Sequence, residues 1–194
     1  MYYICVKQRH KKNSFSRALI IQMMIKKKTL LLCLIILIIY YACEKTKDPS
    51  FDDIVVNELM SMNSSVVTDQ NGEYDDWIEL FNLSSANKDI SGYYLSDNKS
   101  NPSKWQIPPG TSIAGNGYLI IWADKDTTQT GLHANFKLSA EGEEVLLSKP
   151  DGTVIDEVEY PAQTLELSYS RRPNGTGSFT WQNPTFERTN NSPK

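Results

Sequence analysis

The fold of this chain is decided by the stretch Asp76-Trp77-Ile78-Glu79-Leu80-Phe81-Asn82. In an extended backbone, successive side chains point to opposite sides, so Ile78 and Leu80 share one side. The other side carries Trp77, Glu79 and Phe81. This alternation predicts a β-strand with one face buried and one face in water.

Similar short runs extend in both directions from this stretch and are separated by turn residues. Asp151-Gly152 is the strongest hairpin signal, because it joins two runs of β-branched and aliphatic residues. The body shows no 11-residue window with helical spacing, and we expect an all-β fold, a two-sheet sandwich of immunoglobulin type. The predicted strands are residues 54–60, 77–81, 92–96, 104–107, 118–123, 143–147, 154–160 and 167–171.

Charge divides the chain into two parts. Residues 1–42 hold eight basic residues and no acidic one, whereas residues 43–194 hold 20 − 8 = 12 basic and all 23 acidic residues, a net charge of −11. A body of this charge repels a polyanion, and we expect no nucleic-acid partner. Its only cysteine is Cys43 and its only histidine is His133, which excludes cysteine-rich zinc sites, internal disulfides and Cys/His dyads.

Residues 1–42 have the pattern of a secretory signal peptide. Lys26-Lys27-Lys28 is followed by 13 apolar residues, 30–42, and the charged residues after position 43 end this run. A membrane-spanning helix needs about 20 apolar residues, so the run predicts a signal rather than a span. Residues 1–23 are either an over-extended start or a long basic region, and the sequence leaves both open.

The end of the apolar run resembles the lipobox of bacterial lipoproteins, since the small residue Ala42 precedes Cys43. Tyr40 and Tyr41 depart from the usual leucine and small residue of that motif. The resemblance implies cleavage before Cys43 and acylation of its sulfur and new amino group. Residues 43–53 would then be a lipidated tether. The alternative is an incidental cysteine after an ordinary cleavage site.

Seven ordered blocks covering nearly all of residues 54–190 are similar to bacterial lamin-tail domains, with 191–194 left as a C-terminal tail. The resemblance implies an immunoglobulin-like β-sandwich that serves as an interaction or tethering module, and it implies no reaction. Phe186-Glu187 stands where many members have Pro-Gly, so we expect the last turn to differ. The blocks are IVVNELM (54–60), DWIELFNLS (76–84), DISGYYLSD (89–97), KWQIPPGT (104–111), GYLIIWA (117–123), GLH with NFKLS and GE (131–143), and SYSRRPNG with PT (168–185).

One acidic segment offers oxygen ligands for Ca²⁺. Asp69, Asn71, Glu73 and Asp75 lie within seven residues, and hard cations such as Ca²⁺ take oxygen ligands. The spacing differs from an EF-hand loop, because counting from Asp69 puts Gly72 at position 4 instead of 6. The alternative is a solvated acidic loop in which Asn71-Gly72 makes a turn.

Enzymatic interpretations have little support in the sequence. His133 could serve Ser139, but no Gly-x-Ser-x-Gly nucleophile elbow is present. Glu58 and Glu79 on neighbouring strands could be a general acid/base pair. The family resemblance implies instead that they are structural and bind loop amides. We therefore expect that the protein is not an enzyme and needs no cofactor, apart from the Ca²⁺ candidate.

These observations lead to one expectation and several alternatives. We expect an exported, membrane-anchored lipoprotein that binds another envelope protein; Glu44 after the cysteine favours the outer membrane by analogy with lipoproteins. One alternative is a carbohydrate- or Ca²⁺-dependent surface-binding module, and another is an accessory subunit of a separately encoded hydrolase. The side chains that could stack on sugars are Trp77, Phe81, Tyr93 and Tyr94.

Overall fold

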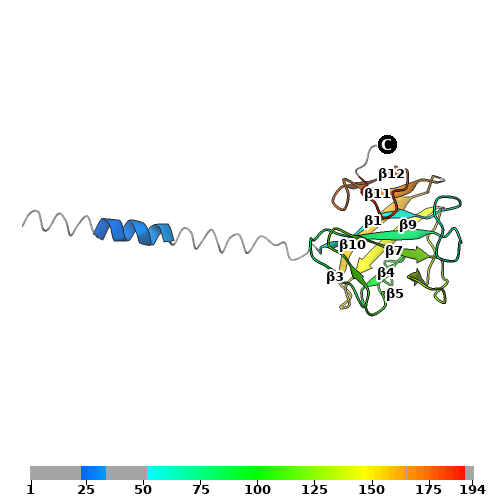
Figure 1. The fold of residues 1–194 in the computed structure, drawn as a ribbon, viewed down its shortest axis with the longest axis horizontal. Helices are drawn as coiled ribbons and strands as arrows, with labels where there is room; N and C mark the ends of the chain where they lie inside the picture. The colour runs from blue at the N-terminus through cyan, green and yellow to red at the C-terminus, as the bar shows by residue number, and fades with distance from the viewer. Residues whose placement is uncertain (1–22, 34–51, 165, 191–194) are drawn as a thin grey trace, which may run out of the picture. The chain divides into compact units, whose positions relative to one another are not determined.

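The computed structural model describes residues 23–33, 52–164 and 166–190 (Figure 1). The chain divides into two units, Met1–Pro49 and Ser50–Lys194. In the first unit, residues 23–33 form a helix with exposed side chains. Within the described ranges, no helix has the length and apolar character needed to cross a membrane. Cys43, most of the predicted tether and the tail 191–194 lie outside the described residues.

The second unit is made of strands, which confirms the predicted all-β fold. All eight predicted strands are present within two residues of their predicted ends. Four further strands, β3, β6, β8 and β12, were not predicted. The strands are β1 (Ile54–Met60), β2 (Trp77–Asn82), β3 (Lys88–Asp89), β4 (Tyr94–Ser96), β5 (Trp105–Gln106), β6 (Ser112–Ile113), β7 (Tyr118–Ala123), β8 (His133–Ala134), β9 (Gly142–Ser148), β10 (Val154–Pro161), β11 (Ser168–Arg172) and β12 (Ser178–Gln182).

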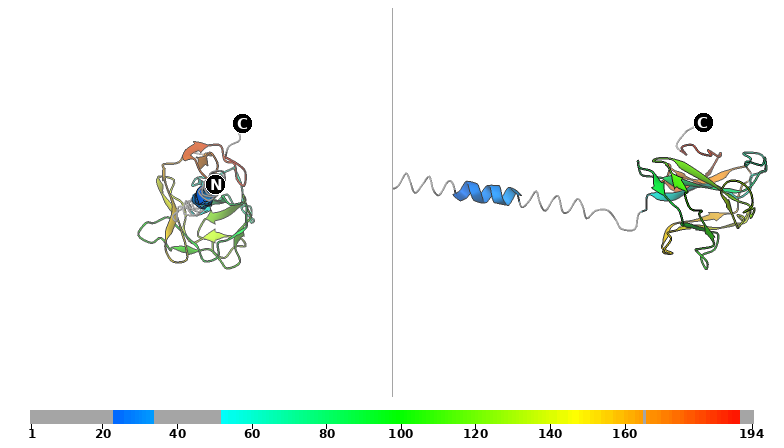
Figure 2. Two further views of the ribbon diagram at one scale, coloured as in Figure 1. Left: turned by 90° about the vertical axis from the view of Figure 1, so that its left-hand side faces the viewer. Right: turned by 60° about the horizontal axis from the view of Figure 1, so that its bottom comes forward.

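The strands form two main sheets that pack face to face as layers (Figure 2). The larger sheet has the order β12-β11-β1-β2-β7-β8, and the smaller has the order β10-β9-β4-β5. β3 and β6 form a separate two-stranded ribbon. All pairs are antiparallel except β7 with β8. β1 and β2 therefore lie at the centre of the larger sheet.

The main core fills the space between the two sheets. Ile78 and Leu80 of β2 lie in it together with Ile54, Val56 and Leu59 of β1. The smaller sheet contributes aliphatic and aromatic side chains, namely Leu95, Val145, Leu147, Val158 and Tyr160. Apolar burial of this extent is the main favourable contribution to folding and needs no disulfide.

The outer face of β2 is also buried, so the prediction of one wet face is wrong for this strand. All six residues of β2 and all seven of β1 are buried. A second apolar cluster covers the outer face, where Trp77 and Trp122 are packed by Phe186 from the C-terminal segment. In Figure 1 this red segment runs beside β11 and β12. The alternating pattern shows where side chains point, but not what covers them.

Two local irregularities shape the strands. Asp151-Gly152 makes the predicted turn between β9 and β10, with Gly152 at φ 86°, where a glycine has no Cβ clash. A β-bulge at Asn57 shifts the pairing of β1 with β2, because Val56 pairs with Leu80 and Glu58 with Glu79. The bulge leaves Asn57 without a register partner on β2, and its side chain donates to Glu79 and accepts the Gly175 N–H.

Candidate functional site

The acidic segment between β1 and β2 folds into a tight turn that gathers three carboxylates. Oxygens of Asp69, Glu73 and Asp75 all lie within 4.8 Å of one another. Gly72, at φ 84°, allows the reversal, and the Asp69 N–H donates to the Glu73 carbonyl at 2.9 Å. Asn71, the fourth predicted ligand, has an exposed side chain, and its backbone N–H donates to Oδ1 of Asp69.

The two oxygens of Asp69 have different surroundings. Oδ1 accepts the backbone N–H groups of Asn71 and Glu73, at 2.9 and 2.8 Å, and so holds the turn. Oδ2 is buried and has no hydrogen-bond partner in the described part of the chain. The whole residue is only 7% exposed. Burying a polar atom without a partner costs about 1–3 kcal/mol, so this oxygen is a position where a ligand would be favourable.

A second loop, after β7, lies against this turn. The Gln129 side-chain N–H₂ group donates to Oε2 of Glu73 at 2.7 Å and to Oδ2 of Asp126 at 3.0 Å. These two acceptors define the orientation of the amide, because a flipped amide would place its oxygen against two carboxylates. The amide oxygen of Gln129 is then buried, and it also has no partner among the described residues.

Negative charge accumulates around the turn. The pKa of Asp75 is raised by partial burial and then by the nearby carboxylates of Asp124, Asp69 and Glu73. Burial raises the pKa of Asp76, the next residue, to about 7. Lys137 is the cation that opposes this effect at both aspartates. Negative charges this close together repel one another, and a cation that joins them relieves the repulsion.

A separate pair of carboxylates lies inside the domain and accepts hydrogen bonds from other groups of the chain. Glu58 and Glu79 pair across β1 and β2, and both are fully buried. Oε1 of Glu58 accepts the Ser168 hydroxyl at 2.5 Å and the Thr185 N–H at 2.9 Å. Oε2 of Glu58 accepts the Thr185 hydroxyl.

Glu79 is bound in the same manner. Its Oε1 accepts the Asn57 side-chain N–H at 2.7 Å, and its Oε2 accepts the Glu187 N–H at 2.6 Å. The predicted role of these glutamates, binding loop amides, is confirmed. Sequence reasoning missed Asn57 and Asn190, which complete the network: the Asn190 side chain donates to the Asn57 carbonyl at 3.2 Å and to the Arg171 carbonyl at 3.0 Å. An asparagine in the middle of the apolar run 54–60 was the available signal.

Burial alters the protonation of this pair. It raises the pKa of Glu79 to about 8 and also raises the pKa of Glu58, against the opposing effect of their hydrogen bonds. The negative charge of Glu58 further raises the pKa of Glu79. The pair therefore holds a proton near neutral pH, and its oxygens are occupied by donors from the chain's own segments.

The histidine considered for catalysis has a structural environment. His133 is 4% exposed, and its Nδ1 lies 2.6 Å from Oδ2 of Asp124. Its Nε2 lies 3.3 Å from the Thr130 carbonyl oxygen. Ser139 is bound elsewhere, because its N–H donates to Glu143 and its hydroxyl oxygen accepts the Glu141 N–H. The structure thus gives His133 and Ser139 different partners.

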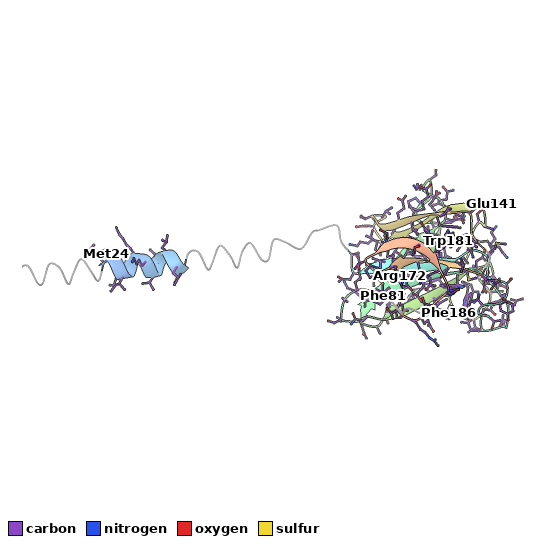
Figure 3. The ribbon with its side chains drawn as sticks, turned by 90° about the horizontal axis from the view of Figure 1, so that it is seen from above. Met24, Phe81, Glu141, Arg172, Trp181 and Phe186 are labelled. Carbon is purple, nitrogen blue, oxygen red and sulfur yellow. The ribbon has the colours of Figure 1, made fainter. Side chains whose placement is uncertain are left out.

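The four aromatic residues considered for sugar stacking do not form one platform. Trp77 is fully buried, and its ring makes an edge contact with Phe186 at 5.2 Å between centroids. Phe81 is 8% exposed and packs on Tyr118. Tyr93 and Tyr94 are half-buried. Phe81 and Phe186 are labelled in Figure 3. A stacking surface that includes Trp77 or Phe81 is therefore ruled out.

Comparison with known families agrees with the fold. The family model described as Lamin Tail Domain matches residues 47–162, which is more than half of the chain. No curated protein matches the chain. β11, β12 and the C-terminal segment follow the matched residues, yet β11 pairs with β1 in the same sheet.

Proposed function

The chain belongs to the lamin tail domain family, and from this premise we propose that it is an exported lipoprotein whose sandwich is a non-enzymatic interaction module. In this proposal Cys43 carries the lipid anchor, residues 44–53 are the tether and the sandwich is the surface presented to a partner. The family supports an interaction module with an immunoglobulin-like fold. The export, the lipid anchor and the non-enzymatic role are supported by the order of parts along the chain and by the contacts of its ionisable groups.

The observation that carries the proposal is the order of parts along the chain. A basic segment, 13 apolar residues and Cys43 come first, and β1 begins at Ile54, after ten intervening residues. Ten extended residues reach at most about 35 Å, so an acylated Cys43 would keep the sandwich close to the membrane surface. Two or three acyl chains bind a bilayer far more stably than one, at about 0.8 kcal/mol per buried methylene.

The environment of the ionisable groups favours binding over catalysis. Glu58, Glu79 and His133 all face backbone or side-chain groups of this chain. A general acid or base needs a substrate proton within hydrogen-bond reach. These three groups are instead hydrogen-bonded to other groups of this chain. The charge of −11 over residues 43–194 favours a neutral or basic partner, and we propose another protein of the cell envelope rather than nucleic acid.

Metabolic labelling with radioactive palmitate tests the anchor. The full-length chain is expressed in a double-membrane bacterium beside Cys43→Ser, with Cys33→Ser as the matched control inside the apolar run. We expect label and membrane association in the wild type and in Cys33→Ser, and neither in Cys43→Ser. Equal labelling of all three proteins would contradict the proposal.

Crosslinking in the same cells tests the interaction role. An epitope-tagged full-length chain is crosslinked, captured and analysed by mass spectrometry, with Cys43→Ser as the unanchored control. We expect a reproducible envelope protein that is depleted at least several-fold in the control. Capture of a hydrolase with co-purifying activity would replace the scaffold role by that of an accessory subunit.

A further inference from the structure

We propose that the turn between β1 and β2, together with the loop after β7, forms a Ca²⁺ site built from Asp69, Glu73 and Asp75, with the amide oxygen of Gln129 as a further ligand. This inference is independent of the lipid anchor and of the interaction role. It names a ligand for residues that neither the fold nor the family explains.

The spacing of the oxygens in the turn suits a single Ca²⁺ ion. Ca²⁺ binds oxygen at 2.3–2.6 Å, so two ligands on opposite sides of one ion lie about 5 Å apart. One carboxylate oxygen from each of Asp69, Glu73 and Asp75 lies within 4.8 Å of the other two. The three groups therefore fit around a single ion without movement of the backbone.

Independently of that spacing, one buried oxygen of the turn has no partner among the described residues. Oδ2 of Asp69 belongs to a side chain that is more than nine-tenths buried, yet it has no donor within the described part of the chain. The other oxygen of the same carboxylate accepts two backbone N–H groups, so rotation of the side chain cannot rescue Oδ2 without breaking the turn. A cation bound there supplies the missing partner.

The loop after β7 contributes a further side chain, Gln129, to the same region. The Gln129 amide nitrogen donates to Glu73 and Asp126, and the oxygen of the same amide is buried without a partner among the described residues. This loop packs on the turn directly, because a Cβ added at Gly131 would lie 3.2 Å from the side chain of Gln70. Two segments far apart in sequence thus converge on one group of oxygens.

The chemistry of the donors selects Ca²⁺. All the donors are carboxylate or amide oxygens, and they lie on a turn and a loop, where the larger and more flexible coordination shell of Ca²⁺ is easier to satisfy than the octahedron of Mg²⁺. Glu73 is exposed and Asp75 half-buried, so water can complete the shell. With three carboxylates, we expect a Kd of about 10⁻⁴ to 10⁻³ M, the range of extracellular Ca²⁺ modules.

The test is Ca²⁺ titration of the full-length chain, purified in detergent and treated with chelator, by equilibrium dialysis against radioactive ⁴⁵CaCl₂ and by thermal unfolding. We expect one Ca²⁺ per chain and, at tenfold excess over Kd, a rise in Tm of about 4 °C. No saturable binding and no shift at 10 mM CaCl₂ would overturn the proposal. An equal shift with MgCl₂ would overturn the assignment to Ca²⁺.

Two variants and a matched control locate the site. Asp69→Asn should weaken Ca²⁺ binding at least tenfold, whereas Asp151→Asn, whose Oδ1 also accepts a backbone N–H at 2.9 Å in a turn, should bind as the wild type. Glu73→Gln changes an exposed side chain and keeps an oxygen that can accept the Gln129 amide. This variant should lose most Ca²⁺ binding, and it keeps the test decisive if Asp69→Asn fails to fold. Wild-type affinity in a folded Glu73→Gln chain would place the ion elsewhere and refute the site.

Discussion

Two groups of carboxylates in this domain show opposite solutions to the same problem. Glu58 and Glu79 are fully buried, and each accepts hydrogen bonds from other segments of the chain. Asp69, Glu73 and Asp75 gather in a surface turn, where one buried oxygen has no donor in the described part of the protein. Internal donors make the first group part of the fold, and their absence at one oxygen makes the second group a candidate for an external ligand.

The largest effect should come from removing a member of the buried pair. Glu58→Ala removes the acceptor of the Thr185 N–H and of the shorter hydrogen bond of the buried Ser168 hydroxyl, and it opens a cavity between β1 and the C-terminal segment. We expect a loss of about 3–4 kcal/mol in the free energy of unfolding, measured by urea denaturation. Glu157→Ala on β10 removes an exposed ion pair with Lys99 and should cost less than about 1 kcal/mol. Equal losses would remove the distinction between buried and exposed carboxylates.

The pH dependence of stability should be the next largest effect. A carboxyl whose folded pKa is about 8 binds more protons when folded than when unfolded, where its pKa is about 4.3. Stability from Glu79 is therefore greatest at low pH and falls as the pH rises from about 4.3 to 8. The expected loss is on the order of 3 kcal/mol between pH 5 and pH 8.5.

Glu79→Gln is the variant that isolates this effect. Glutamine has the same shape and does not titrate, so urea denaturation at several pH values should show a flatter profile than that of the wild type. An unchanged slope would assign the pH dependence to other groups.

A smaller effect should follow from removing the ring of Phe186, which packs over the outer face of β2. Phe186→Ala deletes the edge contact with Trp77 and the tilted contact with Trp122, while it leaves the backbone bonds to the glutamates in place. We expect a loss of about 2 kcal/mol, less than for a fully buried phenylalanine because Phe186 is half-buried. Phe186→Leu should recover about half of it. A loss as large as that of Glu58→Ala would mean that apolar packing, not hydrogen bonding, holds this segment.

The smallest effect should be at Asn71. Its backbone N–H binds Asp69, but its side chain is exposed. Asn71→Ala should change Ca²⁺ affinity in equilibrium dialysis by less than about twofold. A tenfold loss would show that the spacing pattern in the sequence identified the ligands better than the folded turn does.

The sequence was most informative where strands are long and regular. The ends of β1 and β7 are predicted to the residue, because runs of β-branched and aromatic residues between turn signals define them. β3, β6 and β8 have two residues each, too few for any alternation to be read. Their positions depend on pairing with distant strands, which a local pattern does not contain.

The same limit applies to the candidate site. Asp69, Glu73 and Asp75 were predicted from their local concentration of oxygens, but Gln129 lies more than fifty residues away and carries no signal of its own. The covering of Trp77 and Glu79 by the C-terminal segment could likewise not be predicted locally, since it depends on contacts with the distant residues Phe186 and Glu187. Local patterns predict elements, and long-range contacts decide which surfaces remain open.

The contacts of the C-terminal segment with β1 and β2 also affect the order in which the domain can fold. Thr185 binds Glu58 across 127 residues, and Glu187 binds Glu79 across 108. A chain that leaves a ribosome or a translocation pore from its N-terminus presents β1 and β2 long before these partners follow. Contacts of such high sequence separation form slowly, because loop closure must come first. We expect the sandwich to close only after about residue 187 has emerged, so that β1 and β2 wait for partners that are made more than a hundred residues later.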